Sequence, residues 1–542
     1  MKPGAGALRF GALCLIVWTS CSLSSRSGVV LLPVLAATYA DAVAPGAIQR
    51  VCAEDEADLP RYLGGKGLPY AASLVRTLDG RRCHIYYEPT VSGFRASAED
   101  AAVSELVFGI DTAAFLSRRE AVVGDGLDVM KQMLRAVDRP LRVTVGLATE
   151  EDEVYRGALR HHFPESKHEF VVQRHPVEDY NPWAQDFLKA GRVGTESKML
   201  VTRQGFEGRR SMGAEIRPLL DAYAGPRYVR SKLSWEGGDV QFAMHPKEPG
   251  KLVMFYGTSA KRYWGDGLTR EEFEYVMRVE FGADAAVYMG DLAPHVDYLM
   301  TLLPEARTAL VAAPVCGDQR LAKAALEVLE KRFMDGVPRE VAELRGTMTL
   351  EWVEKAKQAH RGWRRRVDRE KAAKVEAYWA ANCPGDERRC LQNGGLRKMV
   401  TEQPEVLRMW AEVAAEAQTE NVLVLRLLDI VEGQLEGCDG KYRHRLEQVI
   451  GMLGQLGFRV VRVPGIPGST DPMSYWTGVS YVNAAVVDKK VFVPRLGLGA
   501  LEDGWLEEMR REMPAGYAVV GVDARLLLLK NGGVHCVMAF GR

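Results

Sequence analysis

The feature that most constrains the fold is an alternation of strand-like runs with helical segments along most of the chain. Residues 121–137 carry apolar side chains at helical spacing, and residues 141–145 then alternate as a strand does. Helical patterns at 214–224 and 269–281 separate later runs. The other strand-like runs in this half lie at 84–87, 170–172, 199–201, 252–255 and 310–312. Repeated strand–helix alternation predicts an α/β domain.

The alternation stops between residues 317 and 455. This stretch is rich in Ala, Glu, Lys, Arg and Leu, and it predicts several amphipathic helices, one of them over 350–380. The outer face of that helix is strongly charged, which is typical of a solvated surface; a partner-binding face is the alternative. Its charged residues are Arg361, Arg364, Arg365, Arg366, Asp368, Arg369, Glu370 and Lys371.

Strand-like runs return after Gly457, at 458–461, 480–487, 491–494 and 518–520. A helix is predicted at 502–512, and a last apolar run lies at 526–529. We therefore expect one α/β domain that a helical insertion interrupts. The expected parts are an N-terminal extension (41–105), the first part of the domain (106–316), the insertion (317–455) and the last part (456–542).

The first 40 residues have the pattern of a secretory signal peptide. Lys2 and Arg9 precede an apolar run at 12–18, and a second run at 29–37 leads to the small residues Thr38 and Ala40. Neither run has the roughly 20 apolar residues that a membrane-spanning helix needs. We expect an exported protein (periplasmic, secreted or lipid-anchored). If this segment is instead an apolar extension, the protein is cytoplasmic.

The cysteine count divides into three groups. Loss of residues 1–40 removes Cys14 and Cys21 and leaves seven cysteines, an odd number for an exported protein. Six of the seven could pair or could simply be buried apolar residues, and the sequence leaves the pairing open. These six are Cys52, Cys83, Cys316, Cys383, Cys390 and Cys438. The seventh, Cys536, is the candidate for a reactive thiol.

Net charge and missing motifs exclude several kinds of function. The 71 Lys and Arg residues balance 71 Asp and Glu residues, so bulk charge would not hold the chain to nucleic acid or to an anionic membrane. The sequence contains no CxxC pair, no HExxH and no GxxxxGK[ST], so zinc and nucleotide sites lack their usual motifs.

Four short segments place polar side chains among turn residues beside strand-like runs. They are WAQD at 183–186, WEGGD at 235–239, HVD at 295–297 and GGVHC at 532–536. Each is weak by itself, because an Asp after a loop is typically a helix cap and Gly-Gly is typically a turn. Together they supply a thiol, an imidazole and several carboxylates, the groups that nucleophilic catalysis uses.

In this order, the four segments resemble the guanidine-modifying hydrolases of the pentein fold. Residues 183–186 and 295–304 look like peptidylarginine deiminases, whereas 235–240 is closer to free-arginine deiminases and dimethylarginine hydrolases. Residues 480–483 and 491–495 resemble agmatine deiminases. The resemblance covers residues 110–315 and 456–542. It implies an α/β propeller of five pseudosymmetric ββαβ modules, with the helical stretch as an insertion.

The resemblance also implies how the substrate is held. A guanidinium stays protonated at physiological pH, and two carboxylates match its planar fork of N–H donors. Asp186 and Asp297 correspond to that pair, and Trp183 would cover the arm or the face of the cation. Asp239 is a further candidate for substrate binding.

The same resemblance implies the catalytic groups. Cys536 would be the nucleophile, and His295 would protonate the departing ammonia and then activate water. Glu236 would orient His295. We expect a structural role for His535, because alternation along an extended strand would turn it away from its neighbour Cys536. Candidates for contacting the substrate backbone remain open among Arg203, Arg209, Arg210 and Arg495.

We therefore expect a cysteine hydrolase that converts a guanidino group to a ureido group plus ammonia, with peptidyl-arginine as substrate and citrulline as product. The alternatives are a deiminase of free arginine or agmatine, an amidinotransferase, and a non-catalytic exported binding protein on the same fold. No metal or organic cofactor enters this chemistry. Calcium dependence stays open, because the calcium-binding residues of animal peptidylarginine deiminases have no match here. The oligomeric state is also open.

Overall fold

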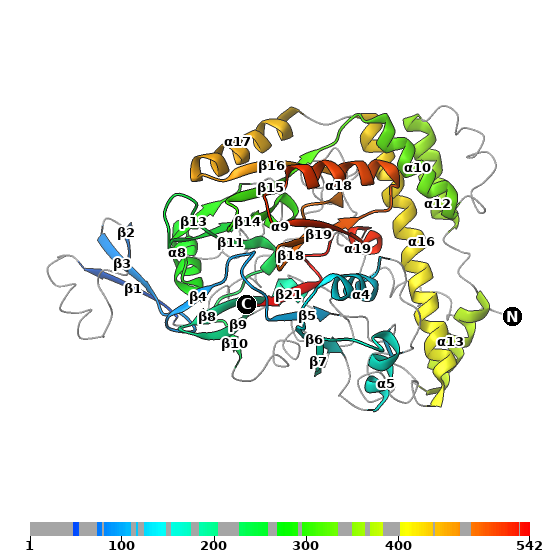
Figure 1. Ribbon diagram of the computed structural model, residues 1–542, viewed down its shortest axis with the longest axis horizontal. Helices are drawn as coiled ribbons and strands as arrows, with labels where there is room; N and C mark the ends of the chain where they lie inside the picture. Colours follow the sequence, from blue (N-terminus) through cyan, green and yellow to red (C-terminus); the bar gives the residue numbers. More distant parts are fainter. Residues whose placement is uncertain are drawn as a thin grey trace. The chain divides into compact units, whose positions relative to one another are not determined.

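Small β-sheets form the frame on which the site residues lie (Figure 1). The computed structural model describes residues 47–53, 73–78, 81–109, 115–116, 124–147, 153–174, 184–203, 227–257, 268–290, 295–333, 349–363, 369–382, 402–436, 440–466, 479–529 and 532–542. All of these fall within Tyr39–Arg542, which forms one compact unit.

Five of the sheets in the described residues share one strand pattern. An antiparallel pair comes first, and a third strand runs parallel to the second member of the pair. In this order the triplets are β8 (Leu188–Val193), β9 (Glu196–Val201) and β10 (Tyr228–Arg230); β11 (Val240–Met244), β12 (Leu252–Tyr256) and β13 (Ala285–Tyr288); β14 (Met300–Leu303), β15 (Thr308–Pro314) and β16 (Arg459–Ile466); β18 (Ala485–Val487), β19 (Lys490–Arg495) and β20 (Ala518–Asp523); and β21 (Met538–Gly541), β5 (Glu105–Gly109) and β6 (Arg142–Leu147). The last triplet pairs the C-terminal strand with an early one.

Other strands extend these sheets or form a separate one. The extensions are β4 (Phe94–Ala96) beside β8, β17 (Val479–Ser480) beside β16, and β7 (Glu169–Arg174) beside β6. A further antiparallel sheet has the order β1-β3-β2 and consists of β1 (Ile48–Ala53), β2 (Leu74–Leu78) and β3 (Arg81–Tyr87). It contains the predicted run at 84–87 and belongs to the expected N-terminal extension.

Helices connect the parallel strands, because parallel neighbours require a crossover connection. These helices are α4 (Gly126–Ala136) between β5 and β6, α8 (Arg270–Phe281) between β12 and β13, and α18 (Ala500–Glu512) between β19 and β20. Helix α5 (Glu153–His162) links β6 to β7. The predicted helices at 121–137, 269–281 and 502–512 are confirmed within the described residues. The one at 214–224 lies outside them.

The helical stretch occupies the crossover between β15 and β16. It contains α10 (Gln319–Phe333), α12 (Leu350–Trp363), α13 (Arg369–Asn382), α16 (Pro404–Glu436) and α17 (Gly440–Leu456). Helices α10, α12 and α13 each contact the long helix α16 (Figure 1). The predicted helix over 350–380 matches α12 and most of α13, and its residues 364–368 lie outside the described residues.

Local sequence signals explain where α8 starts and stops. The Thr269 hydroxyl accepts a hydrogen bond from the Glu272 amide (3.2 Å), and the Glu272 carboxylate accepts one from the Thr269 amide (2.8 Å). This capping box satisfies two amides that the first helical turn leaves unpaired. The helix ends at Gly282, whose φ of 62° is the left-handed conformation that glycine adopts without strain.

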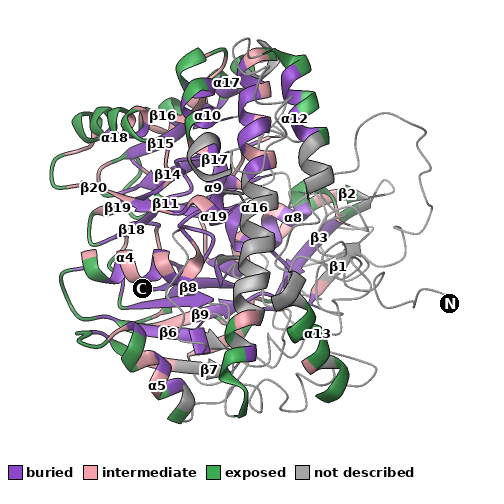
Figure 2. Ribbon diagram, turned by 90° about the vertical axis from the view of Figure 1, so that its right-hand side faces the viewer, coloured by how far each residue is buried: buried purple, intermediate pink, exposed green. Residues whose placement is uncertain are grey.

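One hydrophobic core lies where α8 packs on its neighbouring sheets. Figure 2 shows buried residues concentrated in the strands, with exposed residues on the outer faces of helices such as α5 and α18. The Phe281 ring packs edge-on against Trp235 and at a tilt against Phe242, with ring centroids 5.4 and 5.0 Å apart. This aromatic packing helps to hold β11 and the turn before it in position.

Two sequence expectations for the last part of the domain need correction. The predicted strand 480–487 is broken, because β17 ends at Ser480 and β18 begins only at Ala485. The apolar run at 526–529 lies in a short helix, α19 (Arg525–Leu529). The mixed α/β class is confirmed, whereas the five-fold propeller arrangement and the domain boundaries stay predictions.

The expected signal peptide lies outside the described residues. Within the described part of the chain, no helix is long and apolar enough to cross a membrane. Cys83 and Cys316 are disulfide-bonded. In the strand register, the backbone of Cys52 lies directly opposite Cys83.

Candidate active site

The polar residues singled out in the sequence occupy one kind of position in the fold. In each of the five sheets that share the strand pattern, a short turn or helical turn precedes the first strand. These turns hold Asp186 before β8, Glu236 and Asp239 before β11, His295 and Asp297 before β14, Asn483 before β18, and His535 and Cys536 before β21. Equivalent strand ends thus bring residues from distant parts of the chain to one place.

The first two of these turns are 3-10 helices that contact each other. Asp186 lies in η3 (Ala184–Phe187), and Asp239 lies in η4 (Gly237–Asp239). Helix η4 also contacts the helical turn α9 (Val296–Leu299), and η3 contacts β21. Trp183 lies outside the described residues. The backbone of Asp186 is therefore placed beside the segments that carry the other candidates.

His295 and Glu236 form a close pair. His295 Nε2 lies 2.6 Å from Glu236 Oε2, so the ring N–H donates to a carboxylate that is fully buried. His295 itself keeps 16% of its side-chain surface exposed, which leaves it able to exchange protons with water. A Cβ added at Gly238 would lie 2.6 Å from His295 Nδ1 and 3.1 Å from Asp297 Oδ2. Both side chains therefore pack directly over the Gly238 backbone.

Cys536 keeps a thiol and lies in the same cluster. Its Sγ donates to Asp297 Oδ2 at 3.3 Å, and both residues are almost fully buried. The other carboxylate oxygen of Asp297, Oδ1, has no hydrogen-bond partner among the described residues. A buried carboxylate with one unsatisfied oxygen beside a thiol is suited to bind a cationic N–H donor.

Asn483 is a site residue that the sequence reasoning missed. Its Nδ2 donates to Cys536 Sγ at 3.0 Å, and its Oδ1 accepts from the Cys536 amide at 3.3 Å. The first contact can stabilise a thiolate, and the second fixes the backbone of Cys536. The signal was the break in the predicted strand: a polar Asn at the start of an apolar run marks the turn before a first strand.

The expected orientation of His535 is wrong. Residues 534–537 form a turn, and β21 begins only at Met538, so strand alternation does not apply at His535. Its Nδ1 lies 2.9 Å from Asp297 Oδ2, the same oxygen that Cys536 contacts. Two neighbouring residues of the turn therefore contact one carboxylate oxygen.

Other candidates have observed partners outside the thiol cluster. The Asp239 carboxylate accepts from the Gly257 amide at 3.0 Å, which fixes the end of β12. Arg495 forms ion pairs with Glu502 and Asp503 of α18, and Arg203 is described, whereas Arg209 and Arg210 lie outside the described residues. No group of three or more His, Cys, Asp and Glu side chains in the described ranges is arranged to hold a metal ion.

Part of this cluster lies in a segment that resembles a known protein family. A family model covers the part of the chain that carries Asn483, His535 and Cys536. Residues 415–539 match the Porphyromonas-type peptidyl-arginine deiminase family. This family, like the named relatives below, consists of deiminases, which are hydrolases of guanidino groups. The match ends at Ala539, three residues after Cys536.

Curated relatives match over a shorter stretch. Proteins of Yersinia pseudotuberculosis and Yersinia pestis, both provisionally named agmatine deiminase, are 38% identical over 58 residues. That stretch is 11% of this chain and 15% of each relative, so the match spans about one seventh of their length.

Two solved structures with partial similarity to this chain carry the name agmatine deiminase. The C. jejuni agmatine deiminase is 13% identical, with a TM-score of 0.45, and the similarity covers 82% of this chain and 95% of that one. An agmatine deiminase of Enterococcus faecalis is 13% identical, with a TM-score of 0.41 and coverage of 83% and 96%.

Proposed function

We propose that the chain hydrolyses the guanidino group of peptidyl-arginine to a ureido group, giving peptidyl-citrulline and ammonia. The observation that carries this proposal is the placement of the Cys536 thiol between the Asn483 amide and the Asp297 carboxylate. The His295–Glu236 pair packs against the same Gly238 backbone as Asp297. A nucleophile, a proton carrier and a cation-binding carboxylate are the groups that this reaction needs.

The substrate is held by charge in this proposal. The guanidinium donates to Asp297 Oδ1, which has no partner among the described residues, and to Asp186 on the neighbouring turn. Trp183 covers the substrate arm. Asp239, in η4, supports the site by accepting a hydrogen bond from the Gly257 amide at the end of β12. Burial strengthens these interactions, because few water molecules compete for the buried carboxylate.

The chemistry proceeds in two displacements. Cys536 Sγ, as the thiolate, bonds to the guanidinium carbon, one C–N bond breaks, and the departing nitrogen leaves as ammonia with a proton from His295. The product of this step is an S-linked thiouronium. His295 then takes a proton from water while the water oxygen bonds to the same carbon. The C–S bond breaks, which restores the thiolate, and the added hydroxyl loses its remaining proton to solvent, which leaves the ureido group.

The remaining expectations belong to this proposal. The five strand triplets form a five-fold pentein propeller, the chain is exported after removal of residues 1–40, and the reaction uses no metal or organic cofactor. The recurring strand pattern supports the first, and the basic, then apolar, N-terminus supports the second.

Product analysis tests the proposal. The purified protein is incubated separately with an arginine peptide, free arginine and agmatine, and ureido product and ammonia are both quantified. We expect turnover of the peptide and a loss of at least about 10⁴-fold in Cys536→Ser, because no other thiol in the cluster can replace the nucleophile. The absence of product from every substrate would refute the hydrolase.

Deimination of agmatine is the second candidate, because the relatives that match over 58 residues carry that name. If agmatine or free arginine gives product and the peptide does not, the substrate is a small guanidine and not peptidyl-arginine. Turnover that requires an added amine acceptor would indicate amidino transfer instead.

A further inference from the structure

A buried histidine without a role in the proposed steps links the reacting groups to a second charged cluster. His535 keeps 3% of its surface exposed. Its Nδ1 lies 2.9 Å from Asp297 Oδ2, and its Nε2 lies 3.6 Å from Glu99 Oε2. Nδ1 is therefore at hydrogen-bond distance from one carboxylate, while Nε2 is at ion-pair distance from another and has no hydrogen-bond partner among the described residues. The Phe540 ring packs beside the imidazole, at a centroid distance of 5.9 Å.

This geometry favours the doubly protonated ring. A neutral imidazole carries one N–H and one lone pair, so one nitrogen would oppose a carboxylate with its lone pair. The imidazolium carries an N–H toward each carboxylate. Burial lowers the pKa of His535, but its contacts with Asp297 and Glu99 outweigh burial and raise the pKa above its ordinary value.

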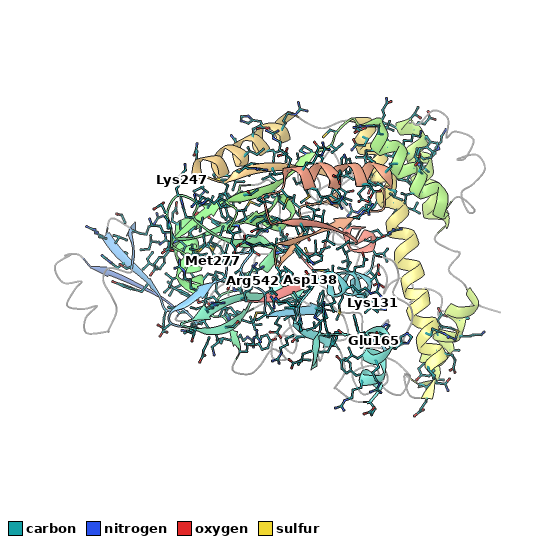
Figure 3. The ribbon with its side chains drawn as sticks, viewed as in Figure 1. Lys131, Asp138, Glu165, Lys247, Met277 and Arg542 are labelled. Carbon is teal, nitrogen blue, oxygen red and sulfur yellow. The ribbon has the colours of Figure 1, made fainter. Side chains whose placement is uncertain are left out.

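The charges behind the ring support the same state. Glu99 Oε1 lies 3.7 Å from Lys189 Nζ, and Glu99 Oε2 lies 3.9 Å from the guanidinium of Arg542, which Figure 3 labels at the end of β21. Burial opposes ionisation of Glu99, yet Lys189, His535 and Arg542 lower its pKa to about 2. Glu99 is therefore a permanent anion in the interior.

A protonated His535 places one positive charge next to the thiol. The groups that face His535 are Asp297 from α9, Glu99 from the loop between β4 and β5, and Cys536 of its own turn. Behind Glu99 lie Lys189 of β8 and Arg542, and Asp100 also acts on Arg542. The three carboxylates match the lysine, the arginine and the imidazolium, and of these three cations the imidazolium belongs to the residue next to Cys536, where it favours ionisation of the thiol.

We propose that His535 is a positioning residue for the deimination: as an imidazolium between Glu99 and Asp297, it fixes the Asp297 carboxylate and favours the thiolate of Cys536. This inference deepens the proposed function and rests on it for the role in turnover. The effect of His535 on the ionisation of Cys536 is the electrostatic part, and it applies to the protein without substrate. The ring donates to Asp297 Oδ2 and so leaves Oδ1 directed to the guanidinium.

The pH dependence of Cys536 alkylation tests the electrostatic part without substrate. Full-length protein is treated with iodoacetamide from pH 5 to 10, and the modified Cys536 peptide is quantified by mass spectrometry. Two neutral variants are compared with the native protein: His535→Gln, and His535→Asn, which keeps a donor near the Nδ1 position. We expect both to move the alkylation midpoint upward by at least about one pH unit, a tenfold loss of thiolate below the midpoint.

A second buried histidine provides the matched control. His168 accepts from the Leu141 amide at 3.1 Å and lies 3.0 Å from the Leu134 carbonyl oxygen, away from the thiol. His168→Gln should lower stability and leave the Cys536 midpoint unchanged. Folded His535 variants with the native midpoint would overturn the proposal.

Two further measurements keep the test decisive. If both His535 variants fail to fold, nitrogen NMR of the native protein decides, because the proposal requires both His535 ring nitrogens to be protonated at pH 8, and a neutral ring contradicts it. With an active enzyme, the variants should lose at least about tenfold in kcat at pH 7 and recover part of it at pH 9. Absence of turnover in the native protein would refute the proposed function. The alkylation midpoint would still test whether His535 favours the thiolate of Cys536.

Discussion

At the scale of single residues, the position of the Cys536 thiol depends on the side-chain amide of Asn483 and on the missing side chain of Gly533. Asn483 contacts both the Sγ and the backbone amide of Cys536. It can do so because Gly533 has no Cβ: an added one would lie 2.5 Å from Asn483 Oδ1 and 2.9 Å from its Cγ. The Gly532-Gly533 pair, which the sequence analysis treated as a turn, thus also makes room for a site residue.

Substitution of this glycine should separate activity from stability. Gly533→Ala displaces Asn483 and removes its hydrogen bond to the thiolate, which is worth about 1.5–3 kcal/mol. We expect kcat/KM for the arginine peptide to fall by at least about tenfold, measured together with urea unfolding.

A second glycine serves as the control. A Cβ at Gly504, inside α18, meets no atom within 4 Å. Gly504→Ala should therefore keep native kcat/KM and stabilise the fold by up to about 1 kcal/mol. Native activity in Gly533→Ala would mean that Asn483 does not hold the thiol.

At the scale of elements, short turns before the first strands carry the site, and helices on the sheet faces hold those strands in place. Lys490 of β19 donates to the carbonyl at the end of α4 (2.6 Å) and pairs with Asp138 (2.7 Å). Lys247, labelled in Figure 3, donates to the Gln455 carbonyl near the end of α17 (2.6 Å). Both lysines complement the negative C-terminal end of a helix.

The capping box of α8 gives a prediction at this scale. Thr269→Ala removes the hydroxyl that accepts from the Glu272 amide, which should lower the free energy of unfolding by about 1 kcal/mol. Thr269→Ser keeps the oxygen and should be close to native in urea unfolding. Helix α8 supplies none of the site side chains, so both variants should keep native kcat. A large loss of kcat in Thr269→Ala would show that α8 also controls the site.

At the scale of the whole molecule, two kinds of cysteine coexist in one chain. Cys83 and Cys316 are disulfide-bonded, while Cys536 keeps its thiol in the interior. A disulfide constrains the unfolded chain, whereas the reaction needs an unbridged sulfur at the site. The fold separates these roles, because Cys83 lies in β3 and Cys316 follows β15 before α10.

A thiol count checks this division. Protein that starts after residue 40 contains seven cysteines, and we expect one titratable thiol in its native form, identified as Cys536 by peptide mapping. Reduction should expose the other six and lower the free energy of unfolding by about 2–5 kcal/mol for each disulfide that is broken. Three or more reactive thiols in the native, unreduced protein would contradict six structural cysteines.

Much of the element pattern could be predicted from the sequence. The strands at 170–172, 252–255 and 310–312 and the helix at 269–281 follow from side-chain periodicity, a local property of the chain. The predicted strand at 480–487 failed at its interior, because hydrophobicity alone does not reveal a turn within an apolar run.

The sequence by itself determined the chemical groups: one thiol near the C-terminus, an imidazole with a carboxylate for a partner, and carboxylates for a cation. Only the tertiary structure decided that His535 and Asn483 join them. Glu99, Lys189 and Arg542 are distant in the sequence from Asp297, and nothing in their local patterns links them. Their contacts arise where separate sheets meet, and the low polarity of that interior makes each charge depend on its neighbours.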